Sequence, residues 1–227
     1  MNVKISNKII IKFFINLLCT PWSYKRDYWK SLSDFPSLSE SPLPWMNYLV
    51  IDHVTKLIRP GFTIFEYGSG SSTLYWISQN CKVISVEHDR PFFEALSKKI
   101  NGKCDYFLVE PTPLKAEDEY NPSSPDLFQS MDKDWKNVSF KDYVTSIDRY
   151  ENNFFDMVTI DGRARPSCIK YAISKLKAGG VLLLDNSDRD YYQTETSAWL
   201  ANWSSKTFKG AVRGSLQLGQ TTIFIKP

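Results

Sequence analysis

Two acids and two glycines are spaced as in a site for a charged, nucleotide-like ligand. Residues 62–77 read FTIFEYGSGSSTLYWI, where an apolar run reaches Glu66 and a turn with Gly68 and Gly70 follows. An acid inside an apolar strand needs a partner that offsets its desolvation, and a cationic amino group would be one. Glycines at the start of a helix leave room for a ligand. Glu87 ends the next apolar run, where an acid can accept both hydroxyls of a ribose.

The same motif narrows the class of ligand. No Gly-Lys-Ser/Thr follows the glycines, so a phosphate loop is excluded. Ser72 lies near the place where a dinucleotide site has its third glycine, which weakens the case for a dinucleotide. One acid for an ammonium group and one for a ribose describe S-adenosylmethionine better than a dinucleotide. The alternative for the glycines alone is a tight strand-to-helix turn that binds nothing.

A second group of polar residues lies in residues 154–192, FFDMVTIDGRARPSCIKYAISKLKAGGVLLLDNSDRDYY. Asp161 ends one apolar run, and Asp185 with Asn186 ends the next. The carboxyl ends of neighbouring parallel strands meet at one edge of a sheet, so these oxygens should converge beside the expected ligand. Hard oxygen ligands of this kind suit Mg²⁺ or Ca²⁺.

The elements that must position these residues follow a βαβ pattern, because short apolar runs alternate with helical segments from residue 62 onward. We expect strands at 63–67, 82–87, 105–109, 155–161 and 181–185, and helices near 71–79, 91–100, 141–149 and 166–177. The segments SKTFKGAV and QTTIFIKP predict two final antiparallel strands. The prediction is an α/β, Rossmann-like fold: a seven-stranded, mostly parallel sheet with helices on both faces and a carboxyl-terminal antiparallel hairpin.

Glu66, Gly68 and Gly70 resemble the first motif of the class I S-adenosylmethionine-dependent methyltransferases, an acid followed by a Gly-x-Gly turn. The resemblance covers about residues 62–226. It implies that the glycine turn holds the methionine and ribose end of S-adenosylmethionine, and that the second strand end and the residues after the third lie beside the adenosine. The cofactor-binding residues that it implies are Glu66, Gly68, Ser69, Gly70, Ser72, Glu87, His88 and Glu110.

The second group resembles that of the metal-dependent catechol and caffeoyl-coenzyme A type O-methyltransferases. In those enzymes an acid after the fourth strand and an Asp-Asn after the fifth hold a divalent cation that acidifies the acceptor hydroxyl. This resemblance implies a Mg²⁺ site at Asp161, Asp185 and Asn186, and these three residues with Arg163 are our candidate catalytic set. Ala164 stands where that family has a lysine base, so no lysine base is assigned.

EYGSGSST and IDGRAR, with a preceding LPW, also resemble motifs of a little-characterised group of bacterial methyltransferase-like proteins. Here Arg163 could pair with Asp161 or Asp185, or hold an anionic acceptor, because a guanidinium matches carboxylate and phosphate groups. If Arg163 pairs with both acids, no cation is required. We expect Arg165 at the surface.

The chain divides into an amino-terminal helical and lid extension at residues 1–60 and a cofactor-binding domain at residues 61–227, with an insertion at about 110–137. Residues 1–18, MNVKISNKIIIKFFINLL, place lysines at every fourth position beside an apolar face. This segment is too short to span a membrane and lacks a secretory cleavage pattern. It predicts a helix that packs on the domain or, with the basic and aromatic residues up to 30, makes peripheral contact with the inner face of a membrane.

Composition excludes several classes of function. A net charge of +3 over 227 residues gives no overall case for nucleic-acid binding. Four cysteines without a CxxC pair fit reduced thiols in the cytoplasm, and two histidines argue against a zinc site.

The sequence therefore predicts an S-adenosylmethionine-dependent methyltransferase that methylates an oxygen of a small-molecule, glycan or lipid-linked acceptor. Catalysis would hold donor and acceptor in line, with Asp161 or Asp185 as base or a cation lowering the pKa of the acceptor. The alternatives are a methyltransferase-fold binding protein without turnover, an aminopropyltransferase and a NAD-dependent oxidoreductase.

Overall fold

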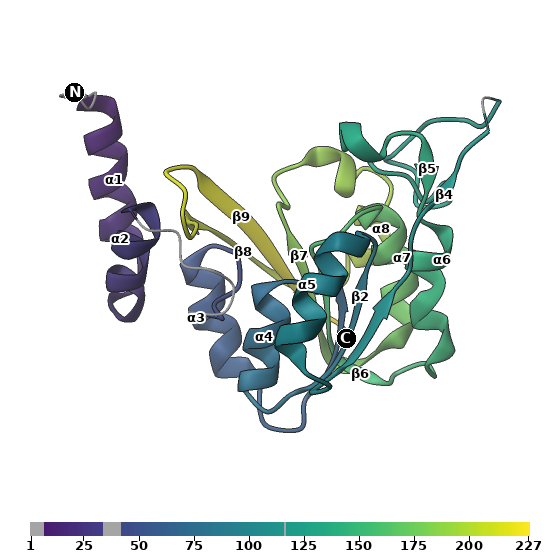
Figure 1. Ribbon diagram of the computed structural model, residues 1–227, viewed down its shortest axis with the longest axis horizontal. Coiled ribbons are helices and arrows are strands. Elements are labelled where there is room, and N and C mark those ends of the chain that lie inside the picture. The colour runs from purple at the N-terminus through teal and green to yellow at the C-terminus, as the bar shows by residue number, and fades with distance from the viewer. Residues whose placement is uncertain (1–6, 34–41, 116) are drawn as a thin grey trace.

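A seven-stranded sheet forms the centre of the computed structural model, which describes residues 7–33, 42–115 and 117–227 (Figure 1). The strands are β1 Thr63–Tyr67, β2 Lys82–Glu87, β3 Asp105–Leu108, β6 Phe155–Ile160, β7 Leu176–Asp185, β8 Ser204–Ala211 and β9 Leu218–Ile225. Their order is β3-β2-β1-β6-β7-β9-β8. The first five are parallel, whereas β9 is antiparallel to both β7 and β8. The predicted α/β fold and its carboxyl-terminal hairpin are confirmed.

Helices cover both faces of this sheet (Figure 1). α3 (Tyr48–Leu57) and α4 (Ser71–Ser78) pack on one face, whereas α6 (Lys141–Thr145), α7 (Arg165–Lys175) and α8 (Ser197–Leu200) pack on the other. α5 (Arg90–Ile100) lies beside β2 and β3. Successive strand residues alternate between the faces, so Phe65 and Tyr67 join the α6 and α7 side and Ile64 joins the α3 and α4 side. The central strands are buried on both faces, which explains why their sequences are mainly apolar.

Several predicted boundaries differ from the structure. β7 begins at Leu176 rather than at residue 181, because the strand continues through Gly179, which has a φ of +73°. The helix predicted for 141–149 is α6 followed by a 3₁₀ turn at Ser146–Arg149. α7 therefore ends at Lys175, two residues before its predicted end, as the chain enters β7.

The amino-terminal segment forms two helices at one end of the molecule, beside the tip of the β8–β9 hairpin (Figure 1). They are α1 (Asn7–Cys19) and α2 (Lys25–Ser33), joined by a 3₁₀ turn at Trp22–Tyr24. Asn16 is 2% exposed, and its amide donates to the Tyr28 hydroxyl (3.0 Å) and to the Leu216 carbonyl (3.2 Å). One face of α1 thus packs on the protein, as predicted. Among the described helices none is long and apolar enough to cross a bilayer, and residues 1–6 of the predicted helix lie outside the described residues.

The insertion after β3 is mostly irregular and lies above the carboxyl edge of the sheet (Figure 1). It contains the short antiparallel strands β4 (Thr112–Pro113) and β5 (Val138–Ser139) and a 3₁₀ turn at Lys133–Trp135. Lys170 on α7 forms an ion pair with Asp126 of the insertion. This contact joins the insertion to the helix that follows β6.

Candidate functional site

The loops that follow β1 and β6 touch at the carboxyl edge of the sheet. Gly68 has a φ of +88°, and a Cβ placed on it would lie 2.6 Å from the Cα of Gly162. A Cβ on Gly162 would lie 2.0 Å from the hydroxyl of Tyr143. By contrast, the nearest atom to a Cβ on Gly70 would be Ser72 Oγ at 3.9 Å. Packing within the protein therefore requires Gly68 and Gly162 but not Gly70.

Glu66 lies beneath this turn and is 1% exposed. Its Oε2 accepts hydrogen bonds from the hydroxyls of Thr73 (2.5 Å) and Ser85 (2.7 Å), and its Oε1 accepts one from the indole of Trp76 (3.1 Å). The Thr73 hydroxyl also accepts from the N–H of Gly70 (2.9 Å). Burial raises the pKa of Glu66, although these donors oppose the shift. Glu66 thus fixes the turn and the start of α4, and its contact with a ligand amino group stays a prediction.

Glu87, at the end of β2, is 3% exposed. Its Oε2 accepts from the backbone N–H (3.2 Å) and hydroxyl (2.6 Å) of Ser69, and its Oε1 accepts from the backbone N–H groups of His88 (2.8 Å) and Asp89 (3.0 Å). Burial alone would raise the pKa of Glu87, but His88 and these hydrogen bonds outweigh it and lower the pKa. The result is an ionised carboxylate beside the glycine turn.

His88 and Arg163 connect this carboxylate to the insertion. His88 Nδ1 is 2.7 Å from Glu87 Oε1, but the geometry of this contact is not that of a hydrogen bond. Arg163 Nε donates to His88 Nε2 (3.3 Å), and Arg163 NH1 donates to Asp132 Oδ2 (2.6 Å). Arg163 therefore pairs with Asp132 rather than with either of the strand-end aspartates.

Arg165 is 6% exposed, so its predicted surface position is wrong. Its guanidinium donates to the carboxylate of Asp161 (2.9 Å) and to the carbonyls of Gly162 (3.0 Å) and Asp185, and it lies 5.0 Å from the centre of the Tyr192 ring. Arg165 is the first residue of α7, and helical side chains point back toward the amino terminus. The side chain therefore returns to the strand ends instead of reaching solvent.

Asp161 and Asp185 both contact this guanidinium, Asp161 through its carboxylate and Asp185 through its backbone carbonyl, but their side chains differ in exposure to solvent. The Asp161 side chain is 27% exposed, whereas Asp185 is 4% exposed and accepts from the Thr221 hydroxyl of β9 (2.5 Å). Burial and the neighbouring charge of Asp185 raise the pKa of Asp161, and Arg165 opposes this shift. Asp161 is therefore the strand-end acid that can meet a ligand and take up a proton near neutral pH.

The residues of the predicted Mg²⁺ site have protein partners in this structure, and the site stays a prediction. Asp161 and Asp185 are already bonded to Arg165 and Thr221, and Arg165 supplies positive charge next to both aspartates. Asn186 follows in a left-handed conformation with a φ of +49°. In the part of the chain that the structure describes, no group of three or more His, Cys, Asp or Glu side chains could hold a metal ion.

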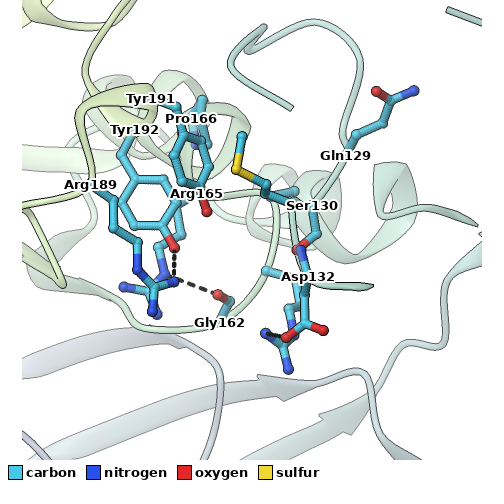
Figure 2. Close-up of a pocket in the computed structure, with 12 residues that line it drawn as sticks. Gln129, Ser130, Asp132, Gly162, Arg165, Pro166, Arg189, Tyr191 and Tyr192 are labelled. Carbon is cyan, nitrogen blue, oxygen red and sulfur yellow. Dashed lines mark hydrogen bonds and ion pairs between the residues drawn. The ribbon is translucent and has the colours of Figure 1, made fainter. Parts of the chain in front are cut away.

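Two neighbouring pockets open at this edge. The glycine pocket, of about 290 Å³, is lined by Gly68, Ser69, Glu87, His88, Asp89, Phe92, Trp135, Asp161, Gly162 and Arg163. The arginine pocket, of about 270 Å³, is lined by Gln129, Ser130, Met131, Asp132, Gly162, Arg163, Ala164, Arg165, Pro166, Arg189, Tyr191 and Tyr192 (Figure 2). Gly162 and Arg163 line both, so they form the wall between the pockets.

Four predicted cofactor residues do not line the glycine pocket. Glu66 and Gly70 support its turn, Ser72 is 6% exposed in the first turn of α4, and Glu110 forms a surface ion pair with Arg90 (2.5 Å). Sequence reasoning missed Asp132 and Trp135, which come from an insertion without periodicity, and Arg189, which follows the Asp-Asn pair in the same strand-end loop.

Comparison with solved structures agrees with this architecture. No protein-family model matches the sequence, and neither does any curated protein. A methyltransferase-like protein from Silicibacter pomeroyi has 21% identity and a TM-score of 0.55, over 82% of this chain and 91% of that one. An O-methyltransferase from Bacillus cereus in complex with S-adenosylhomocysteine has 12% identity and a TM-score of 0.51, over 100% of this chain and 94% of that one. At such identities the likeness establishes a shared Rossmann-like methyltransferase fold.

Proposed function

We propose that the protein transfers the methyl group of S-adenosylmethionine to a hydroxyl oxygen of a small acceptor. The observation that carries this proposal is Glu87, a buried and ionised carboxylate at the end of β2 beside the glycine turn. In open α/β sheets ligands bind outside the carboxyl ends of the strands, and an acid at this position accepts ribose hydroxyls. The shared methyltransferase fold makes S-adenosylmethionine the nucleoside that fits best.

Ser69 would exchange partners when the nucleoside binds. Its hydroxyl now donates to Glu87 Oε2 (2.6 Å) and contacts the Tyr106 hydroxyl (2.7 Å). A ribose hydroxyl would take the place of Ser69 on Glu87, and the Ser69 hydroxyl would keep Tyr106 as its partner. The exchange leaves no buried hydroxyl without a hydrogen bond, so it costs little.

Asp161 is the base in this proposal. It lines the glycine pocket beside Gly162, which also lines the arginine pocket, so it lies where a donor and an acceptor would meet. The acceptor oxygen attacks the methyl carbon in line as the carbon–sulfur bond breaks, and Asp161 takes the hydroxyl proton while the sulfonium becomes a neutral thioether. A carboxylate whose pKa is raised, here to about 8, is a stronger base than an ordinary one and accepts that proton more readily.

Calorimetric titration of the full chain with S-adenosylmethionine tests the proposal. We expect saturable binding at one site and at least about tenfold weaker binding to Glu87→Gln, because a charged hydrogen-bond acceptor is lost. Glu94→Gln, an exposed change on α5, is the matched control and should bind like the unchanged protein. A folded protein that binds no S-adenosylmethionine would remove the proposal, and binding of NADH instead would favour an oxidoreductase.

A further inference from the structure

The arginine pocket has an excess of positive charge that its own acids do not balance. Arg163 is paired with Asp132 and Arg165 with Asp161. Arg189 has no carboxylate partner among residues 7–33, 42–115 and 117–227, and its NH1 donates to the hydroxyl of Tyr192 (2.8 Å). A guanidinium that lines a pocket without an acid is available to an anionic ligand.

Arg189 and Arg165 approach the same side of this pocket (Figure 2). Both lie over the Tyr192 ring, with the Arg165 guanidinium carbon 5.0 Å and that of Arg189 5.7 Å from its centre. Asp161 balances the charge of Arg165, so Arg189 is the guanidinium over this ring that has no carboxylate partner in the part of the chain that the structure describes. Tyr191 and Met131 add apolar surface beside them, and the volume of about 270 Å³ is small for a ligand pocket.

We propose that the acceptor is a small hydroxylated anion whose carboxylate or phosphate group binds Arg189. Its hydroxyl then faces the wall formed by Gly162 and Arg163, toward Asp161. The inference rests on the proposed function and adds the class of acceptor. Both anion types match a guanidinium in the same bidentate way, so the experiment includes one arm for each.

Binding of matched probes to protein saturated with S-adenosylhomocysteine tests this assignment. The probes are 4-hydroxybenzoate, its neutral analogue 4-hydroxybenzamide, and phenyl phosphate, each titrated by calorimetry. We expect an anion to bind at least about tenfold more tightly than the amide, and Arg189→Gln to abolish the difference. Arg189→Lys should keep part of this preference for the anion, because lysine keeps the positive charge but cannot form the two parallel hydrogen bonds of a guanidinium. Arg59→Gln, an exposed arginine before β1 at the opposite edge of the sheet, should change nothing.

The inference is overturned if the amide binds as tightly as the anions, if no probe binds, or if Arg189→Gln binds the anions like the unchanged protein. The affinity for S-adenosylhomocysteine is measured in every variant, and the probes are also titrated without it. Loss of nucleoside binding in the unchanged protein would count against the proposed function, whereas loss of anion preference alone would count only against the role of Arg189.

The outward face of α1 supports a second, independent inference. Its apolar side chains are largely exposed: Ile11 57%, Phe14 55%, Ile15 51% and Leu18 75%, and the adjoining Trp22 is 86% exposed. Residues 7–33 contain five basic residues and one acid, so they carry more net positive charge than the whole chain, which has +3. A second copy of this surface would bring like charges together, whereas an anionic lipid surface complements both the apolar face and the charge.

We infer that α1 binds peripherally to anionic lipid membranes. In co-sedimentation, the full chain should pellet with vesicles of phosphatidylcholine and phosphatidylglycerol, less so at high salt, and not with phosphatidylcholine alone. The double variant Phe14→Asp, Leu18→Asp should stay in solution, and Trp199→Asp, on α8 where Trp199 is 41% exposed, should pellet normally. Equal binding to neutral vesicles, no binding to anionic ones, or a dimer that the double variant dissociates would overturn the inference.

Discussion

The glycine pocket and the arginine pocket share a wall but differ in the groups that line them. Glu87 in the first accepts hydrogen bonds from hydroxyl and backbone N–H donors, whereas the second is lined by the guanidinium of Arg165, which donates to the Asp161 carboxylate and to the Asp185 backbone carbonyl. Mostly neutral donors leave the first pocket with a net negative charge, which suits a neutral ribose and a cationic sulfonium. The second pocket has a surplus of arginine, which suits an anion. Under the proposed function, this difference in charge would direct the donor to the first pocket and the acceptor to the second.

Gly68→Ala should produce the largest effect, because the new Cβ would meet the Gly162 backbone at 2.6 Å and the φ of +88° disfavours any side chain. We expect a loss of about 3 kcal/mol in the free energy of unfolding, measured by urea denaturation. Gly70→Ala has open space and should change it by less than about 0.5 kcal/mol. Equal losses in the two variants would contradict the described stacking of the two loops.

Thr73→Val should cost about 2 kcal/mol, because Glu66 loses a buried donor and the Gly70 N–H loses its acceptor. Removing the donor raises the already raised pKa of Glu66 further. A raised folded-state pKa means that stability is lost as pH rises through it, so the deficit should be larger at pH 8 than at pH 4. A pH-independent deficit would show that Glu66 does not depend on Thr73, and Thr194→Val, at an exposed threonine, serves as control.

Arg165→Lys tests the contact between the two pockets through the pKa of Asp161, which lines the glycine pocket, whereas Arg165 lines the arginine pocket. The ammonium keeps the positive charge but cannot keep all the contacts of the guanidinium, so its attraction for the Asp161 carboxylate is weaker and the pKa of Asp161 should rise further. The measurement is a carbon-13 NMR titration of the Asp161 carboxyl group. The base acts only when it is deprotonated. As the pH is lowered, this variant should therefore lose methyl transfer at a higher pH than the unchanged protein does. An unchanged or lowered pKa would be inconsistent with the described pairing.

Asp132→Asn should have the smallest effect. The Arg163–Asp132 pair is about one-third exposed on both sides, so its loss should lower the free energy of unfolding by less than about 1 kcal/mol. S-adenosylhomocysteine binding should be nearly unchanged, because Arg163 keeps its contact with His88. A loss above about 2 kcal/mol would mean that the insertion is held mainly through this pair.

The sheet could be predicted because each buried strand is a mainly apolar run, and the strand ends place Glu87, Asp161 and Asp185 at one edge. The roles of Arg163 and Arg165 could not be predicted, because they depend on where α7 begins. Ala164, between them, has a φ of +46°, and the two arginines have different partners: Arg163 bonds to Asp132 and Arg165 to Asp161. The partner of Arg163 could not be predicted either, since Asp132 lies in an irregular segment whose path over the sheet is set by tertiary contacts.

A crystal structure of the complex with S-adenosylhomocysteine tests the central claim most directly. The account predicts that both ribose hydroxyls donate to Glu87, that Ser69 has turned to Tyr106, and that the sulfur faces the wall between the two pockets beside Asp161. A nucleoside bound elsewhere, or bound at this edge with no contact to Glu87, would contradict it.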